Sequence, residues 1–245
     1  MADLTVTPIV ALDLPSMASA LDIVRILGDR CTFYKIGSEL FTAEGPVMIH
    51  ALRKAGREAF LDLKFHDIPQ TVGAAVTSAA RLGVRLVTVH ASGGRTMLEA
   101  AASAAATSAT AGGDRCKVLA VSVLTSLDAA ALGEAWGRLD LDVGTEVLRL
   151  AGLARDAGLD GLVCSALEAQ VVRQEFGSDL ELLVPGIRLA GDPAHDQSRV
   201  ATPSAAAVAG ATYIVVGRAV TGAADPREAM SRVRAELQDS RRSGI

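Results

Sequence analysis

The segment 58–71 reads EAFLDLKFHDIPQT, a short strand pattern that carries closely spaced charges. Within it, residues 59–64 form an apolar run that Asp62 and Lys64 interrupt, and Asp67 follows three residues later. Side chains alternate along a strand, so Asp62 and Lys64 point to the same face, roughly 7 Å apart along the backbone. Charged side chains are rarely buried unless they are paired, and a buried ion pair is a poor source of stability. The cluster therefore predicts a functional site.

The same pattern of a buried strand followed by a helix repeats along the whole chain. Nearly continuous apolar strands indicate burial on both faces, and hence a parallel sheet. Strands are predicted at 8–14, 32–37, 59–64, 86–90, 118–124, 161–165, 182–185 and 213–217. Helices are predicted at 16–27, 44–55, 71–82, 95–108, 143–157, 166–176, 203–209 and 226–238, with Ser16 and Thr71 as helix-capping residues.

Eight such units of similar length predict one (β/α)8 barrel, of the TIM-barrel type, over residues 1–245. The length suits either one such barrel or two small domains, but no Pro-, Gly- or Ser-rich linker divides the chain. A doubly wound open sheet is the alternative, and the similar lengths of the eight units favour closure.

Composition argues against several classes of partner. The net charge is −4 and no run of Lys or Arg is present, which argues against nucleic acid, because affinity for phosphate backbones needs clustered positive charge. No apolar run approaches the roughly eighteen residues of a membrane span, and the N-terminus lacks the pattern of a signal peptide. Cys31, Cys116 and Cys164 have no metal-like spacing. We expect reduced core thiols in a cytoplasmic protein.

Polar residues gather at the predicted carboxyl ends of the strands, where the chemistry of such barrels takes place. They are Asp13, Lys35, Asp62, Lys64, His90, Thr125, Ser126, Arg188, Gly217 and Arg218. An alternating-sign cluster is predicted from Lys35, Asp62, Lys64 and Asp67. In such a cluster the carboxylates hold each lysine in its charged form. A lysine that stays protonated is suited to deliver a proton to a developing carbanion and to stabilise its charge.

The ends of the last two strands predict a phosphate site. Loops after the seventh and eighth strands commonly bind phosphate through backbone N–H groups and a helix N-terminus. Arg188 and Arg218 would add bidentate contacts to phosphate oxygens. The segment between them, 188–202, is long and polar enough to be a lid over a ligand.

Each candidate also has a structural interpretation. Asp62 and Lys64 would form a salt bridge at the barrel mouth, and Asp13 and Thr125 would cap helices. Arg188 and Arg218 would pair with surface carboxylates. Among the histidines, His90 would pack beneath the site, His66 would support either the loop or the site, and His50 would lie on the surface.

The segment 61–72 resembles the signature of the orotidine 5′-phosphate decarboxylase family. The resemblance extends over nearly the whole chain and includes residues 9–13, 34–37, 89–94, 124–126, 163–165, 185–188, 196–203 and 214–218. It implies decarboxylation of orotidine 5′-phosphate to UMP and CO2, the last step of de novo pyrimidine nucleotide synthesis, with no cofactor and no metal. The lid sequence and the Ala-rich helices are particular to this chain.

The resemblance also implies a role for each matching position. Lys64 would donate the proton to C6 of the pyrimidine, Asp62 would lie against the substrate carboxylate, and Lys35 would bridge the ribose and the charge network. Asp13 would bind a ribose hydroxyl, and Thr125 the pyrimidine edge. The phosphate and the closed lid would be held by Arg188, Gln197, Gly217 and Arg218.

A homodimer with shared sites is implied as well. Asp67, with Ile68 and Thr71 beside it, would enter the active site of the partner subunit. Lys64 and Asp62 would then act in their own subunit's site.

Two other functions remain open at this point. One is a Mg2+-dependent sugar-phosphate decarboxylase or aldolase on the same barrel, which shares the Asp-x-Lys-x-x-Asp pattern. That group would need a carboxylate on the second strand, where this chain has Lys35, and a cation beside a divalent metal is unfavourable. The other is a non-catalytic barrel that binds phosphorylated metabolites, against which the complete set of charges argues.

Overall fold

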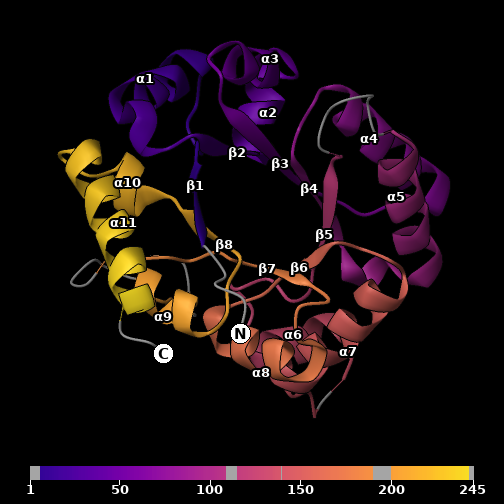
Figure 1. Cartoon of the computed structure of the whole chain (residues 1–245). Helices are drawn as coiled ribbons and strands as arrows, with labels where there is room; N and C mark the ends of the chain where they lie inside the picture. Colours follow the sequence, from indigo (N-terminus) through magenta and orange to yellow (C-terminus); the bar gives the residue numbers. More distant parts are fainter. Residues whose placement is uncertain (1–5, 109–114, 139, 190–199, 243–245) are drawn as a thin grey trace.

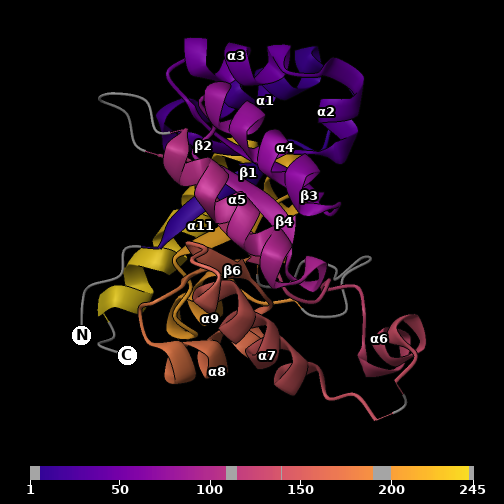
Figure 2. The ribbon, with the colours of Figure 1, turned by 90° about the vertical axis from the view of Figure 1, so that its right-hand side faces the viewer.

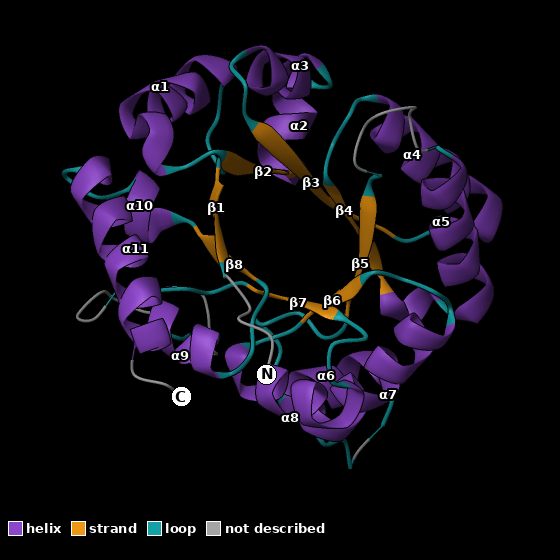
Figure 3. Cartoon of the chain, viewed as in Figure 1, coloured by secondary structure: helices purple, strands orange, loops and turns teal. Residues whose placement is uncertain are grey.

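The computed structural model describes residues 6–108, 115–138, 140–189 and 200–242, and within them parallel strands close into a barrel (Figure 1). The strands pair in chain order from β1 to β8, and β8 returns to pair with β1. Figure 3 shows the strands as an inner ring and the helices outside it. The predicted (β/α)8 barrel is confirmed, and the doubly wound alternative is wrong.

Every predicted strand is present, with bounds that differ by a few residues. The strands are β1 (Thr7–Ala11), β2 (Phe33–Gly37), β3 (Glu58–Phe65), β4 (Leu86–His90), β5 (Lys117–Val121), β6 (Gly161–Val163), β7 (Glu181–Val184) and β8 (Tyr213–Val216). β1 and β5 end three residues earlier than predicted, so Asp13 and Leu124 lie in the loops beyond these strands.

The helices cover the outside of the strands. They are α1 (Met17–Leu27), α2 (Ser38–Glu44), α3 (Val47–Lys54), α4 (Pro69–Arg81), α5 (Arg95–Thr107), α6 (Ala129–Trp136), α7 (Val143–Asp156), α8 (Ala166–Phe176), α9 (Pro203–Val208), α10 (Arg218–Thr221) and α11 (Pro226–Arg242). Short 3-10 turns follow α1 at Gly28–Arg30 and β4 at Ala91–Gly93. Figure 2 shows α6 set apart from the ring of helices.

The helix predictions were wrong in three places. The predicted helix at 44–55 is present as α3 but begins only at Val47, because Gly45 has a positive φ of 66° and Pro46 follows it. The helices α2, α6 and α10 were not predicted. Thr71 is not a cap, because α4 begins two residues earlier with Pro69 at its first position. Ser16 does cap α1, where its side chain accepts a hydrogen bond from the backbone N–H of Ser19.

Two apolar clusters form the core. The larger lies between the strands and the helices and includes Val10, Tyr34, Ile36 and Leu61. The smaller fills the barrel interior with alternate residues of the strands, namely Ile9, Ala11, Phe33, Phe60, Leu86, Leu119, Leu183, Tyr213 and Val215. Because these side chains fill the barrel, a ligand has room only at its end.

Ion pairs lie at the amino-terminal end of the barrel. Lys117 Nζ is 2.5 Å from Glu181 Oε1, and the Tyr213 hydroxyl donates to the other oxygen of Glu181 at 3.1 Å. Arg85 pairs with Glu58 on the neighbouring strand. We refer to these five residues as the closed-end network.

Aromatic rings complete this end of the barrel. The guanidinium of Arg85 lies 5.7 Å from the centroid of the Phe33 ring. That ring meets Tyr213 edge-on at 6.3 Å. Such contacts combine apolar area with the charge of the guanidinium, so the Phe33 ring covers part of Arg85.

Candidate active site

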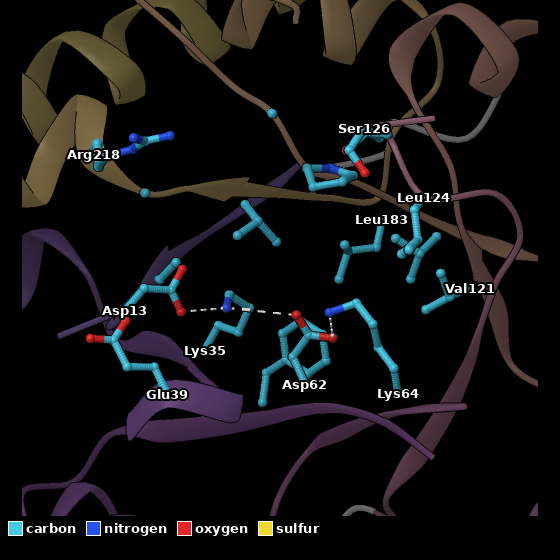
Figure 4. A pocket seen from close by; sticks show the side chains of 18 of the residues that line it. Asp13, Lys35, Glu39, Asp62, Lys64, Val121, Leu124, Ser126, Leu183 and Arg218 are labelled. Atoms are coloured by element: carbon cyan, nitrogen blue, oxygen red, sulfur yellow. Dashed lines mark hydrogen bonds and ion pairs between the residues drawn. The ribbon is translucent and has the colours of Figure 1, made fainter. Parts of the chain in front are cut away.

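A cavity of about 550 Å3 opens at the carboxyl-terminal ends of the strands (Figure 4). Its volume lies within the range of small-molecule sites. Most of the predicted site residues line it, namely Asp13, Lys35, Asp62, Lys64, Thr125, Arg188, Gly217 and Arg218. Ser126, Glu39 and Thr221 line it as well, and the last two were not singled out in the sequence.

Four charged side chains form a row along one wall of this cavity. Lys35 Nζ is 2.8 Å from Asp13 Oδ1 and 3.6 Å from Asp62 Oδ2. Lys64 Nζ is 2.9 Å from Asp62 Oδ1. Figure 4 shows the order Asp13, Lys35, Asp62 and Lys64 across the wall. Within one chain the row therefore differs from the predicted cluster, because Asp67 does not line the cavity and Asp13 joins the row beside Lys35.

Asp62 is the most constrained charge of the row. Its side chain is 13% exposed. Burial alone would raise the pKa of Asp62, but the charges of Lys64 and Lys35, with hydrogen bonds from Lys64 and Thr88, outweigh burial and lower that pKa below its ordinary value. The carboxylate is therefore ionised at neutral pH. Lys64 is more open to the cavity, with 34% of its side chain exposed.

The backbone of β3 is distorted where these residues lie. Among the described residues, Lys64 is the only non-glycine residue with a positive φ, at 51°. The register with β4 shifts between Leu61 and Phe65. Such bulges aim side chains in directions that a regular strand does not allow. The alternation expected from a regular strand thus describes Asp62 correctly but does not describe how Lys64 reaches it.

Thr88 of β4 was missed by the sequence analysis, although it contacts both Asp62 and Lys64. Its hydroxyl donates to Asp62 Oδ1 at 2.9 Å and accepts from the backbone N–H of Lys64 at 3.0 Å. Threonine is an ordinary strand former, so this residue in the middle of a strand carries no local signal of a site.

Gly37 was also missed, and the charged row passes close to it. A Cβ at this position would lie 2.7 Å from Asp13 Oδ1 and 2.8 Å from Lys35 Nζ. Any other residue would therefore displace the Asp13–Lys35 pair.

The predicted phosphate residues lie around another part of the cavity. Arg188 is 8% exposed, and its guanidinium donates to the carbonyl of Ile187 at 2.9 Å. Its backbone N–H donates to the carbonyl of Ala201 at 2.9 Å, which joins the two ends of the loop after β7. Gly217 precedes Arg218, the first residue of α10. Gln197 and the rest of segment 190–199, in the predicted lid, lie outside the described residues.

Asp67, Ile68 and Thr71 do not line the cavity of their own chain. All three are exposed, and Ile68 is an apolar side chain with 65% exposure. The Asp67 carboxylate accepts a hydrogen bond from the N–H of Ile68 at 2.6 Å, next to the start of α4.

Three histidines, His50, His66 and His90, lie in the described part of the chain, beside the site or away from it. The rings of His66 and His90 are 5.3 Å apart. Burial, together with the charges of His66 and Lys64, lowers the pKa of His90. His90 is half-buried and is absent from the cavity wall, whereas His50 is exposed.

The capping interpretations of Asp13 and Thr125 were wrong. Ser16 caps α1, and Asp128 caps α6 by accepting a hydrogen bond from the N–H of Ala131 at 2.9 Å. Asp13 instead pairs with Lys35, and Thr125 lines the cavity.

The described part of the chain holds no group of three or more His, Cys, Asp or Glu side chains placed to bind a metal ion. Its helices also include none that is both long enough and apolar enough to cross a membrane.

Known proteins resemble this chain over nearly its full length. The model of the "Orotidine 5'-phosphate decarboxylase / HUMPS family" matches residues 7–233. A curated orotidine 5′-phosphate decarboxylase from Halorhodospira halophila is 49% identical over 229 residues, which cover 94% of each chain. Another from Dichelobacter nodosus is also 49% identical, over 94% of this chain and 97% of the relative.

A solved structure agrees with these relatives. The crystal structure of orotidine 5′-phosphate decarboxylase from Lactobacillus acidophilus has a TM-score of 0.83 and 38% sequence identity, and the match covers 94% of this chain and 98% of that one. The family model and the curated relatives each span far more than half of the sequence. The chain therefore belongs to the orotidine 5′-phosphate decarboxylase / HUMPS family.

Proposed function

We propose that this chain converts orotidine 5′-phosphate to UMP and CO2 in pyrimidine synthesis, without a cofactor. The observation that carries the proposal is the row of alternating charges on the cavity wall, which ends at Lys64. The curated relatives bear the name of this activity over nearly the full length of the chain.

Lys64 would act as the proton donor. When the bond between C6 and the carboxylate breaks, the electron pair stays on C6 and CO2 leaves. The ammonium of Lys64 would stabilise that developing charge and then transfer a proton to C6, after which the amine regains a proton from solvent. Its Nζ lies 2.9 Å from Asp62 Oδ1, which holds the donor at the end of the row that is open to the cavity.

Asp62 would lie against the carboxylate of the substrate. Two carboxylates in contact repel each other, and the repulsion ends when CO2 leaves, so the pair raises the energy of the bound ground state. The lowered pKa of Asp62 keeps its charge at neutral pH, which this role requires.

The remaining residues would bind the parts of the substrate that are distant from the reacting bond. Arg188, Gly217 and Arg218 lie together at the cavity and would bind the phosphate through guanidinium and backbone N–H groups. Asp13 would accept a hydrogen bond from a ribose hydroxyl, and Thr125 would contact the pyrimidine edge. Binding energy from the distant phosphate would orient the reacting carboxylate at Lys64.

A homodimer with shared sites would complete the arrangement. Asp67, Ile68 and Thr71 are exposed and lie outside their own cavity. An isoleucine with 65% exposure at the start of α4 is a side chain that a partner subunit would cover. We place Asp67 and Thr71 in the partner's site. The three cysteines are buried thiols of the core, which fits a cytoplasmic enzyme.

The Mg2+-dependent alternative is disfavoured by the position of Lys35. Its ammonium is 2.8 Å from Asp13 and 3.6 Å from Asp62, between the carboxylates that would otherwise attract a divalent cation. A fixed positive charge at that point repels such an ion.

One assay tests the proposed function. Purified protein is treated with chelator and mixed with orotidine 5′-phosphate, and loss of the orotate absorbance is followed. We expect turnover with no added metal. Absence of turnover, or turnover that depends on added Mg2+, would overturn the proposal. A binding measurement with UMP on the same preparation shows that the cavity is intact.

A further inference from the structure

The row of charges depends on an irregular region between β3 and β4. Leu61 pairs with Val87 and Phe65 pairs with Val89, so the three residues 62–64 stand opposite the single residue Thr88. The backbone of β3 therefore cannot continue a regular ladder at this point. Asp62 and Lys64 are both in the irregular part, and Lys64 has the left-handed φ of 51°.

The Thr88 side chain supplies the hydrogen bonds that the regular ladder lacks here. Its hydroxyl accepts from the backbone N–H of Lys64 at 3.0 Å and donates to Asp62 Oδ1 at 2.9 Å. A hydroxyl has one donor and two acceptor positions, so a single oxygen can make both contacts at once. Thr88 is fully buried, with 0% exposure, so water does not replace either contact.

We propose that Thr88 is a positioning residue of the reaction, which holds the backbone of Lys64 and the carboxylate of Asp62 in one fixed relation. The inference rests on the decarboxylation proposed above. Asp62 Oδ1 accepts from both Lys64 Nζ and Thr88, so the hydroxyl fixes the side of the carboxylate that faces the lysine. Small displacements of a donor from the reacting atom cost large factors in rate.

The charged and titratable groups that face Asp62 come from three strands. They are Lys35 on β2, Lys64 on β3 and His90 on β4, with Asp13 beyond Lys35. Both lysines would remain after the Thr88 hydroxyl is removed. A change in the titration of Asp62 in a Thr88 variant would therefore report the lost hydrogen bond and the altered distance to Lys64.

The first test compares Thr88→Val with Thr88→Ser. Valine keeps the branched shape but has no hydroxyl, and serine keeps the hydroxyl. For Thr88→Val we expect kcat to fall by roughly 10- to 100-fold, the size of a lost hydrogen bond to a charged group. KM should stay within about threefold, because Thr88 does not line the cavity. Thr88→Ser should keep kcat within about fivefold of the parent.

Ser122 provides a matched control. It is also buried, follows β5, and donates its hydroxyl to the carbonyl of Val163 at 2.8 Å without touching the charged row. Ser122→Ala should change kcat by less than about threefold. An equal loss of kcat in Ser122→Ala and Thr88→Val would mean that removing any buried hydroxyl lowers kcat. That result would overturn the positioning role of Thr88.

The second test needs no substrate, so it separates this inference from the proposed function. The carboxyl carbon of Asp62 is followed by NMR as pH is varied. Loss of the Thr88 hydrogen bond should raise the pKa of Asp62 in Thr88→Val, and Thr88→Ser should restore it. An unchanged pKa of Asp62 in Thr88→Val would overturn the role of Thr88. If the pKa rises in Thr88→Val but the parent enzyme does not decarboxylate the substrate, only the proposed decarboxylation is contradicted.

A further variant covers the case in which Thr88→Val does not fold. Thr88→Cys is close in size to Thr88→Ser but carries a weak hydrogen-bonding group. We expect its kcat to be at least about fivefold below that of Thr88→Ser. Equal kcat values in the serine and cysteine variants would contradict the proposal.

Discussion

The two ends of the barrel contain the same kind of ion pair in different surroundings. At the amino-terminal end, Lys117 is 2.5 Å from Glu181, and 30% of its side chain is exposed. At the carboxyl-terminal end, Lys64 is 2.9 Å from Asp62, and 34% of its side chain is exposed. By the distance between the charged atoms and the exposure of the lysine alone, the two pairs would be judged alike.

Their backbones and neighbours differ. Lys117 belongs to a regular ladder in which β4 and β5 pair without interruption from Leu86 to His90, and a tyrosine hydroxyl completes the bonding of Glu181. Lys64 lies in an irregular part of β3 with a positive φ, at the end of a row whose charges share partners. Backbone irregularity and shared partners, more than the presence of an ion pair, distinguish the reactive end.

The largest expected effect comes from removing each lysine in turn. Lys64→Ala should reduce kcat by about 10⁴-fold or more, because the proton donor is lost. Lys117→Ala should keep kcat within about threefold, because its network does not reach the cavity. Both variants should lose about 1–3 kcal/mol of unfolding free energy, since each leaves a carboxylate with fewer partners. Turnover and denaturant unfolding measure the two quantities.

UMP binding to Lys64→Ala serves as the control for an intact cavity. Retained turnover in Lys64→Ala would contradict its role as donor. An equal loss of turnover in Lys117→Ala would show that the two ends are coupled, and would remove the contrast between them.

The next prediction tests whether the active site is shared between two chains. Lys64→Ala and Asp67→Ala should each be nearly inactive alone. After subunit exchange in an equal mixture, half of the dimers are hybrids with one intact site, so activity should return to about a quarter of the parent value. Exchange is verified with differently tagged chains. Exchange with no recovery would contradict the shared site.

A smaller effect concerns stability at low pH. The folded-state pKa of Asp62 lies below its ordinary value of 3.8. The stability that this shift contributes is fully present above 3.8 and is lost as pH falls through the folded pKa. Unfolding free energy should therefore decline more steeply with acidification in the parent than in Asp62→Asn. Denaturant unfolding at a series of acidic pH values measures this, and parallel curves would contradict the shift.

The smallest effect is expected at the closed end. Tyr213→Phe removes the hydrogen bond to Glu181 and keeps the ring against Phe33. Unfolding free energy should fall by about 0.5–1.5 kcal/mol, while kcat/KM should stay within about twofold. A fall in kcat/KM of more than about twofold would argue that the closed-end network influences the cavity.

Sequence was sufficient for the barrel and for most of the charged row. Parallel strands end at one edge of the sheet, so polar residues at successive strand ends, such as Asp13, Lys35 and Asp62, were expected to meet. The strands were predicted because their apolar runs are nearly continuous. Helices with weaker patterns, such as the short α10, were missed, and the Gly45–Pro46 break inside a predicted helix was not recognised.

The site residues that the sequence did not predict depend on how neighbouring strands pair. Thr88 matters because three residues of β3 stand opposite it, and that register cannot be derived from either strand alone. Asp67 was placed in the row by its distance along the chain, but the turn before α4 directs it away from the cavity. Asp13 is distant in sequence but joins the row beside Lys35, because β1 pairs with β2.

Gly37 offers a diagnostic for comparing barrels of this kind. A single carbon added there would lie within 3 Å of both members of the Asp13–Lys35 pair. A protein that carries a side chain at the matching position must therefore shift the end of at least one of these two charged side chains, even when both are retained. A residue other than glycine at that one position is thus a sequence signal that the contact between the first two strand-end charges has changed.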